Sequence, residues 1–258
     1  MSFLSFKDQT VLVTGGSSGI GFGVAQAFAE AGAILHIMSQ SSDIVAAAEK
    51  LSLNSSVPVT AHQCDIQNSE AVKEALASIG QLDVLVANAG VERVTPITDL
   101  SSQTEEDFRT IINTNILGTY YVTREAVRYM KQGSNIIITA SIWGRTGVAE
   151  FSGYVASKHA NIGFMRSLAR ELGPEGIRVN CVCPGWVKTG PAMQSLKEIA
   201  EDKQVSEEEA LSEITANQCL PGIQEPSDIA GLYLYLASPF ASNITGQSIN
   251  ADRGERLS

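Results

Sequence analysis

The stretch Val11-Leu-Val-Thr-Gly-Gly-Ser-Ser-Gly-Ile-Gly-Phe-Gly23 decides how this chain folds. Its first three residues have the β-branched content and the shortness of a buried strand, and the glycines that follow permit a sharp turn into a helix from about Ile20. Because glycine has no Cβ, backbone N–H groups can approach a ligand closely, and the first helical turn adds unpaired donors and a positive dipole end. The stretch therefore predicts a cradle for a phosphate group.

Taken alone, the glycines are also compatible with a tight turn that only allows close packing of a helix on a strand. The glycines concerned are Gly15, Gly16, Gly19, Gly21 and Gly23. The order of the elements that follow favours the phosphate cradle. Strands are expected at 11–13, 33–38, 57–62, 82–87, 135–140, 177–182 and 247–250, with helical patterns between them. This alternation predicts a single doubly wound, Rossmann-type α/β domain with a parallel seven-stranded sheet and helices on both faces.

Size and charge agree with one large domain, 1–258. The chain has 258 residues and a net charge of −10, which argues against a broad surface that follows nucleic-acid phosphates. The segment Met1–Asp8 has no basic region followed by an apolar run, and no stretch approaches the roughly 18 apolar residues of a membrane span, so a cytoplasmic protein is expected. The four cysteines and three histidines lack the spacing of a ligand cluster, and no metal is expected.

Two segments depart from a simple alternation. A long helical pattern runs from Thr104 to Lys131, yet its middle contains Asn115 and Gly118, which are poor helix formers. The stretch at 190–220 is polar and acidic, with helical spacing over 194–214. Such an insertion at the ligand end of a sheet is typical of a substrate lid.

The end of the second expected strand bears on the cofactor. In dinucleotide-binding folds an acidic residue here binds the adenosine ribose and repels a 2′-phosphate, whereas this chain has Ser39-Gln40-Ser41-Ser42. Without a carboxylate, NADP(H) is slightly favoured over NAD(H), although neither this segment nor Ser17-Ser18 supplies a basic residue. The serines are equally compatible with capping of the next helix.

Four polar residues are expected to meet near the sheet's ligand end. Tyr154 and Lys158 are four residues apart, so on a helix over 152–172 their side chains share a face. An isolated tyrosine titrates at about 10, and an adjacent ammonium group lowers that pKa. Ser141 follows the fifth expected strand, and Asn115 lies in a helix that flanks the same crevice.

These features resemble the short-chain dehydrogenase/reductase family. Its Thr-Gly-x-x-x-Gly-x-Gly loop is similar to 14–21, and its Asn-Ser-Tyr-Lys tetrad is similar to the four polar residues. The similarity continues over nearly the whole chain, through Asn88-Ala89-Gly90, Arg178-x-Asn180, Pro184-Gly185, Thr189 and Gly246. It implies that Tyr154 is the general acid–base and that Ser141 binds the reacting oxygen. It also implies that Lys158 holds the nicotinamide ribose and that Asn115 anchors a proton-relay water.

The resemblance further implies a nicotinamide dinucleotide, NAD(P)(H). The family's cofactor-binding positions correspond to Gly15, Ser17, Ser18, Gly19, Ile20, Gly21, Ser39, Gln40, Asp65, Ile66, Asn88, Ala89, Gly90, Tyr154, Lys158, Pro184, Gly185, Val187 and Thr189. Among these, Asp65 would face the adenine ring, and Thr189 would meet the nicotinamide carboxamide. Three departures stand out, because Ala140 replaces a frequent serine, Arg253 replaces a frequent glycine, and 220–226 lacks a common arginine.

The expected reaction is interconversion of a secondary alcohol and a ketone by hydride transfer. Glu92, Trp143, Glu150 and Trp186 are expected to line the substrate site. The sequence around Glu92 resembles glucose 1-dehydrogenases, which suggests a polyol or sugar-like small molecule, although Glu92 could equally be a solvated ion-pair partner of Arg93. The alternatives are a 3-oxoacyl-thioester reductase of fatty-acid type and a non-catalytic nucleotide-binding scaffold. Apolar residues on more than one side of two long helices predict a homo-oligomer, a tetramer or otherwise a dimer.

Overall fold

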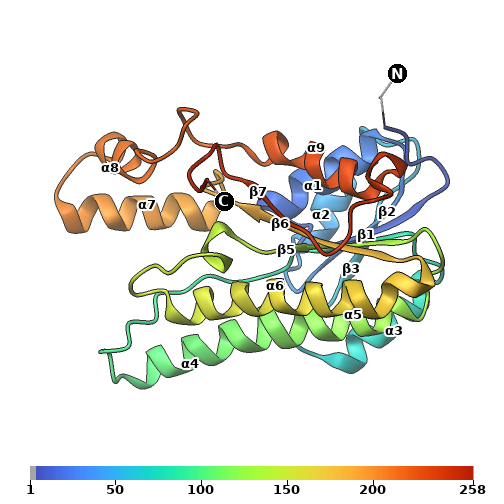
Figure 1. The fold of residues 1–258 in the computed structure, drawn as a ribbon, viewed down its shortest axis with the longest axis horizontal. Helices are drawn as coiled ribbons and strands as arrows, with labels where there is room; N and C mark the ends of the chain where they lie inside the picture. Colours follow the sequence, from blue (N-terminus) through green and yellow to red (C-terminus); the bar gives the residue numbers. More distant parts are fainter. Residues whose placement is uncertain (1–3, 258) are drawn as a thin grey trace.

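The structure is a computed structural model that describes residues 4–257, and a parallel sheet of seven strands runs through its centre (Figure 1). The strands are β1 (Thr10–Thr14), β2 (Ile34–Ser39), β3 (Thr60–Gln63), β4 (Val84–Ala87), β5 (Asn135–Thr139), β6 (Arg178–Pro184) and β7 (Ser248–Ala251). Their order in the sheet is β3-β2-β1-β4-β5-β6-β7. This order confirms the doubly wound sheet, and it reverses between β1 and β4, where such sheets bind ligands.

Helices cover both faces of the sheet. One face carries α1 (Gly19–Glu30), α2 (Ile44–Ser52) and α9 (Pro226–Ala237), and the other carries α3 (Ser69–Ile79), α5 (Thr119–Val127) and α6 (Ser152–Leu172). Successive residues of β1 divide between the two apolar cores, because Val11 and Val13 pack in one and Leu12 in the other. Within 4–257, no helix combines the length and the apolar character that a membrane crossing requires.

The expected helix over 104–131 is wrong in its middle. The chain forms α4 (Ser102–Ile111), then a π-helical segment (Ile112–Gly118), and then α5. A Cβ at Gly118 would lie 2.7 Å from the side chain of Ile66, so this glycine lets a residue after β3 approach the helix. Wide π turns are frequent at functional sites. Here the turn contains Asn115, whose poor helix propensity was the visible sign of it.

Two other expectations need correction at their boundaries. β3 begins at Thr60 rather than 57, because Pro58 has no N–H and the N–H of Val59 bonds to the Ser52 hydroxyl at 2.9 Å. The helical spacing over 194–214 belongs to two helices, α7 (Gly190–Lys203) and α8 (Glu207–Ile214). They separate at Gln204, whose φ is 55°, and Ser206 begins α8 with a capping box.

Two histidines form a pair across the edge of the sheet. His36 on β2 and His62 on β3 lie side by side, with Nδ1 of the first 2.9 Å from Nε2 of the second. Their rings stack with centroids 5.2 Å apart. Burial, followed by the charge of His62, lowers the pKa of His36 to about 4. The pair is therefore built to be neutral.

This pair predicts a specific loss of stability in acid. The unfolded chain binds a proton at His36 near pH 6.5, whereas the folded chain does so only near 4, so stability present above 6.5 is lost as the pH falls through this window. Because the pair is only half-buried, we expect a contribution of about 1 kcal/mol, or about 2–4 °C in Tm. In thermal melts, His36→Gln should show a smaller Tm decrease than the wild type between pH 7 and pH 4.5. His159→Gln, which removes an exposed histidine, should match the wild type; equal decreases in all three would contradict the assignment.

Candidate active site

The phosphate cradle has the geometry that the glycines predict. Gly15 and Gly19 adopt φ of 68° and 55°, which disfavour residues with a Cβ. A Cβ at Gly21 would collide with the carbonyl oxygen of Gly15, so this glycine allows α1 to begin directly against the turn. The N-cap residue of α1, Ser18, makes no side-chain capping bond, and the first turn has no acidic residue. The N-terminal N–H groups of α1 can therefore meet an anion.

Thr14 joins this cradle to the end of the neighbouring strand β4. Its hydroxyl accepts the N–H groups of Asn88 and Ala89 at 3.0 Å each, and its carbonyl accepts the side-chain amide of Asn88 at 3.0 Å. A Cβ at Gly15 would lie 2.9 Å from the same amide. The Asn88-Ala89-Gly90 segment is thus held against the glycine turn at the point where the sheet reverses order.

The serines after β2 bond both to one another and to the start of α2, where the Ser41 hydroxyl accepts the N–H of Asp43 at 3.2 Å and donates to its carboxylate at 3.0 Å. The Ser17 hydroxyl donates to the Ser39 hydroxyl at 3.1 Å, and the latter also accepts the N–H of Ser41 at 3.3 Å. The N-cap residue of α2 is Asp43, which makes no side-chain capping bond. Ser39 and Gln40 line the same pocket as the glycine turn, together with Asp65 and Ile66. The expected adenosine-binding residues are thus brought together on one pocket wall.

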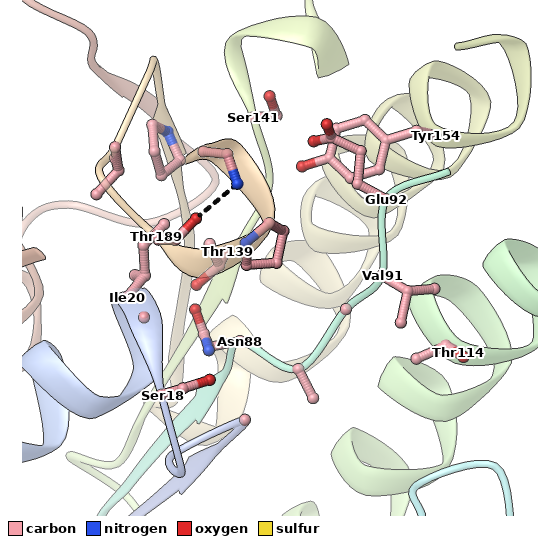
Figure 2. A pocket seen from close by; sticks show the side chains of 18 of the residues that line it. Ser18, Ile20, Asn88, Val91, Glu92, Thr114, Thr139, Ser141, Tyr154 and Thr189 are labelled. Carbon is pink, nitrogen blue, oxygen red and sulfur yellow. Dashed lines mark hydrogen bonds between the residues drawn. The ribbon is translucent and has the colours of Figure 1, made fainter. Parts of the chain in front are cut away.

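The tyrosine and lysine of α6 lie on one face, as expected. The Lys158 ammonium donates to the carbonyl of Thr139 at 2.9 Å and lies 5.4 Å from the centre of the Tyr154 ring. Ser141 follows β5, and its hydroxyl accepts the N–H of Trp143 at 3.1 Å. Figure 2 shows Ser141, Tyr154 and Glu92 directed into the same part of the pocket.

The electrostatics of this group differ from the expectation. Burial and then the charge of Glu92 raise the pKa of Tyr154, and a hydrogen bond with Ser141 only partly offsets them. Burial lowers the pKa of Lys158 to about 8, against an opposing effect of Glu92. The protein's own groups therefore keep the phenol protonated, and the ammonium of Lys158 does not by itself lower the tyrosine pKa below its usual value. A protonated phenol is the form that can donate a proton to a carbonyl oxygen.

Asn115 has a different place from the other three residues. Its amide group is fully engaged, because Oδ1 accepts the N–H of Val91 at 2.8 Å and Nδ2 donates to the Val91 carbonyl at 2.9 Å and to Ser157 at 3.0 Å. The Ser157 hydroxyl donates to the carbonyl of Tyr154 at 2.7 Å. Asn115 does not line the pocket. Its side chain instead ties the segment before Glu92 to the helix that carries Tyr154.

One pocket of about 510 Å³ contains most of the expected site. Of the expected substrate residues, Glu92, Trp143 and Trp186 line it. Glu150 does not: it is exposed with a φ of 67°, and its carbonyl accepts the N–H of Thr95. Of the expected cofactor residues, all but Gly21 line the pocket, and Gly21 acts through the packing of the turn.

The structure adds lining residues that the sequence analysis did not identify: Cys64, Val91, Arg93, Thr114, Thr139, Ala140 and Ile142. Thr139 is the most informative of them, because its carbonyl holds Lys158 and its hydroxyl lies 2.9 Å from the Tyr233 hydroxyl. Its position at the carboxyl end of a buried strand was the available signal. Pro191 and Ala192 belong to α7, so the helical insertion borders the pocket.

Comparison with known proteins agrees with this arrangement. The family model described as enoyl-(acyl carrier protein) reductase matches residues 15–255. D-xylose 1-dehydrogenase from Caulobacter vibrioides is 36% identical, with 98% of this chain and 97% of the relative covered. Diacetyl reductase from Staphylococcus epidermidis is 33% identical, with 95% of this chain and 98% of the relative covered.

Solved structures agree as well. A short-chain dehydrogenase from Burkholderia cenocepacia in complex with NADP has a TM-score of 0.83 at 30% identity, with 98% of this chain and 99% of that chain covered. L-sorbose reductase from Gluconobacter frateurii, complexed with NADPH and L-sorbose, has a TM-score of 0.91 at 25% identity, with 99% of each chain covered. The chain therefore belongs to the short-chain dehydrogenase/reductase family, and it is an oxidoreductase of that family.

Proposed function

We propose that the protein interconverts a secondary alcohol and a ketone, with NADP(H) as the preferred cofactor and a polyol or sugar-like compound as substrate. The observation that carries the proposal is the convergence of Tyr154 and Ser141, with Lys158 behind them, in the pocket that the phosphate cradle opens into. This arrangement has a proton donor and a hydroxyl beside it, both next to a dinucleotide-sized cleft.

The residues fit a nicotinamide dinucleotide. The turn at Gly15–Gly21 and the uncapped start of α1 would hold its pyrophosphate, and Ser39 with Gln40 would meet the adenosine ribose. The bound cofactor would supply the hydride, which is its own chemistry. Thr189 and Val187 also line the cleft and would orient the ring that carries it.

The chain's own residues would manage the proton and the substrate oxygen. In ketone reduction Tyr154, kept protonated by burial and by Glu92, donates its proton to the carbonyl oxygen while the Ser141 hydroxyl bonds to the same oxygen. In alcohol oxidation the steps run in reverse. Lys158, anchored on Thr139, places a positive charge behind the tyrosine as it loses its proton.

Glu92 and Trp143 support a hydroxyl-rich substrate. Burial raises the pKa of Glu92, so its carboxyl group gains from hydrogen-bond donors such as sugar hydroxyls. The Trp143 ring lies edge-on to Tyr154, with centroids 5.9 Å apart, and adds an apolar wall beside the reacting group. The names of two relatives, D-xylose 1-dehydrogenase and L-sorbose reductase, point in the same direction.

A second candidate is a 3-oxoacyl-thioester reductase, since relatives with this description include a 3-oxoacyl-[acyl-carrier-protein] reductase from Chlamydia trachomatis at 34% identity. An acyl carrier is acidic and favours a basic rim, whereas α8 in the expected lid begins with three glutamates, Glu207–Glu209, which disfavours this candidate. The deciding experiment is a panel of D-xylose, L-sorbose, diacetyl and an acetoacetyl thioester, read by absorbance of reduced nicotinamide. Highest kcat/KM for the thioester would overturn the sugar proposal, and no turnover of any secondary alcohol or ketone would support a non-catalytic scaffold.

The position of Glu92 predicts a shift in the pH profile. Its charge raises the pKa of Tyr154, so Glu92→Gln should lower that pKa and make phenolate available at lower pH. We expect the acidic limb of kcat/KM for alcohol oxidation to move down by about 1 pH unit. Glu150→Gln, an exposed glutamate outside the pocket, is the matched control and should leave the limb in place. An unchanged or upward-shifted limb in Glu92→Gln would show that the carboxylate does not act on the tyrosine.

We also propose that the protein is a homo-oligomer, a tetramer or otherwise a dimer. Phe108, Leu117 and Tyr120 leave 39–41% of their surfaces exposed along α4, the π segment and α5, so these helices present large apolar side chains to a partner subunit. Family members pair these helices across a two-fold axis. Light scattering at micromolar concentration should give a multiple of 27.4 kDa, and Leu117→Glu should reduce it. A monomeric mass for the wild type would refute the proposal.

A further inference from the structure

The helices α7 and α8 pack mainly on each other. Leu196, Ala200 and Ala210 form a small apolar core between them, and Trp186 from the pocket wall packs against this core. The chain leaves the sheet at Pro184, the helical segment begins at Thr189, the N-cap residue of α7, and the chain returns through 220–224. The place of this helical pair over the pocket therefore depends on how its two ends are held.

Gln224 of the returning end pairs with Val187, and residues 220–223 before it are held by one arginine. Arg253 Nη1 donates to the carbonyl of Pro221 at 2.8 Å, and Nη2 donates to that of Ile223 at 3.4 Å. The carbonyl of Arg253 accepts the N–H of Leu220 at 3.0 Å. The same guanidinium lies 3.5 Å from the carboxylate of Asp228 on α9. Three successive parts of the returning segment are thus fastened to one residue of the C-terminal turn, and through it to α9.

The backbone at this position favours a different residue. Arg253 has a φ of 55°, a left-handed conformation that glycine adopts without strain and other residues adopt at a cost. The turn does not need the guanidinium, because the Asp252 carboxylate accepts the N–H groups of Gly254 at 3.1 Å and Arg256 at 3.0 Å. What the arginine adds is the charge-assisted bonding of its side chain to the returning segment.

We infer that Arg253 is a positioning residue that latches the α7–α8 segment over the pocket and thereby sets the affinity for substrate. The inference rests on the proposed function, in which this segment is the substrate lid of a single domain. Arg253 touches neither the cleft nor the reacting groups. It acts through the segment that carries Pro191 and Ala192 at the pocket wall and that packs on Trp186. Loosening the latch should therefore weaken substrate binding and leave the cofactor cradle unchanged.

The test uses Arg253→Gly, which removes the guanidinium and suits the left-handed backbone, so the turn should persist. We expect faster amide hydrogen exchange over 190–224 without substrate, and a KM about tenfold higher for whichever of D-xylose, L-sorbose and diacetyl is turned over fastest. The KM for NADP(H) and the kcat should stay within twofold. Arg253→Lys should recover part of the effect, because an ammonium group can still bond to one carbonyl. Lys188→Ala is the control: it breaks a half-exposed ion pair with Glu225 that joins the two ends of the segment, and because such pairs contribute little it should change neither readout.

The two readouts separate this inference from the proposed function. Unchanged exchange over 190–224 in Arg253→Gly would overturn the latch, whatever the enzyme acts on. Faster exchange with an unchanged KM would overturn the claim that the latch sets substrate affinity. If the wild type reduces or oxidises none of the three compounds, the proposed substrate class fails, while the exchange measurement still decides whether the latch exists.

Discussion

Tyr154→Phe is expected to lower turnover by about 100- to 10,000-fold, the usual contribution of a positioned acid–base group, while changing cofactor affinity by less than about twofold. The substitution deletes the proton that the substrate oxygen must receive and removes little binding surface. Ser141 and Lys158 remain, but a serine hydroxyl is a much weaker acid, and the Lys158 ammonium is directed to the carbonyl of Thr139. The measurements are kcat with the best substrate of the panel and Kd for NADPH by fluorescence.

Tyr233→Phe is the matched control for this experiment. Tyr233 is fully buried, and its hydroxyl lies 2.9 Å from that of Thr139 at the end of β5. The variant therefore also removes one buried tyrosine hydroxyl close to the site. It does not line the pocket. The control should retain turnover within about tenfold. A decrease of less than tenfold in Tyr154→Phe, or a loss of NADPH binding in proportion to activity, would contradict the role of Tyr154.

Ser39→Asp should shift cofactor preference toward NAD(H) by about 1–3 kcal/mol, the scale of a hydrogen bond to a charged group, or about 5- to 150-fold in relative kcat/KM. A carboxylate here would accept a bond from the ribose hydroxyl and repel a 2′-phosphate. In the structure the Ser39 hydroxyl accepts hydrogen bonds from the Ser17 hydroxyl and from the N–H of Ser41. The same donors would stabilise the aspartate.

Gln40→Arg is the opposing variant. Its guanidinium would match a phosphate group and should move the preference toward NADP(H). Both variants keep the glycine turn and the catalytic residues intact, so each reports on the adenosine end alone. The measurement is kcat/KM with both cofactors for the wild type and the two variants. If neither ratio moves, the segment after β2 does not face the adenosine ribose.

The sheet and the cradle could be predicted from the sequence because local signals determine them. Clustered glycines predict the turn, and Gly15 and Gly19 do adopt a positive φ there. Continuous apolar runs predict strands that are buried on both faces. The shared helix face of Tyr154 and Lys158 follows from helical spacing, whereas their roles were implied by the family resemblance. Each of these features depends on residues close together in the chain.

Other features depend on contacts between distant residues and could not be predicted in detail. The π turn at Asn115 depends on two distant contacts. Ile66 packs against Gly118, and the side-chain amide of Asn115 bonds to both the N–H and the carbonyl of Val91. Glu150 is four residues before Tyr154, but it precedes α6 and has a positive φ, so its side chain does not line the pocket. The pKa of Tyr154 is likewise set by burial and by Glu92, which is 62 residues away in the chain.

The side-chain amide of Asn115 also has a meaning for protein engineering. It fastens the backbone before Glu92 and, through Ser157, the backbone of Tyr154, so the two groups share one rigid frame. The side chains of Glu92 and Trp143 are not part of that frame. A library that varies these two positions would therefore leave the backbone that positions the proton donor in place, although replacing Glu92 would also change the pKa of Tyr154. Varying Asn115 would instead move both backbone segments at once.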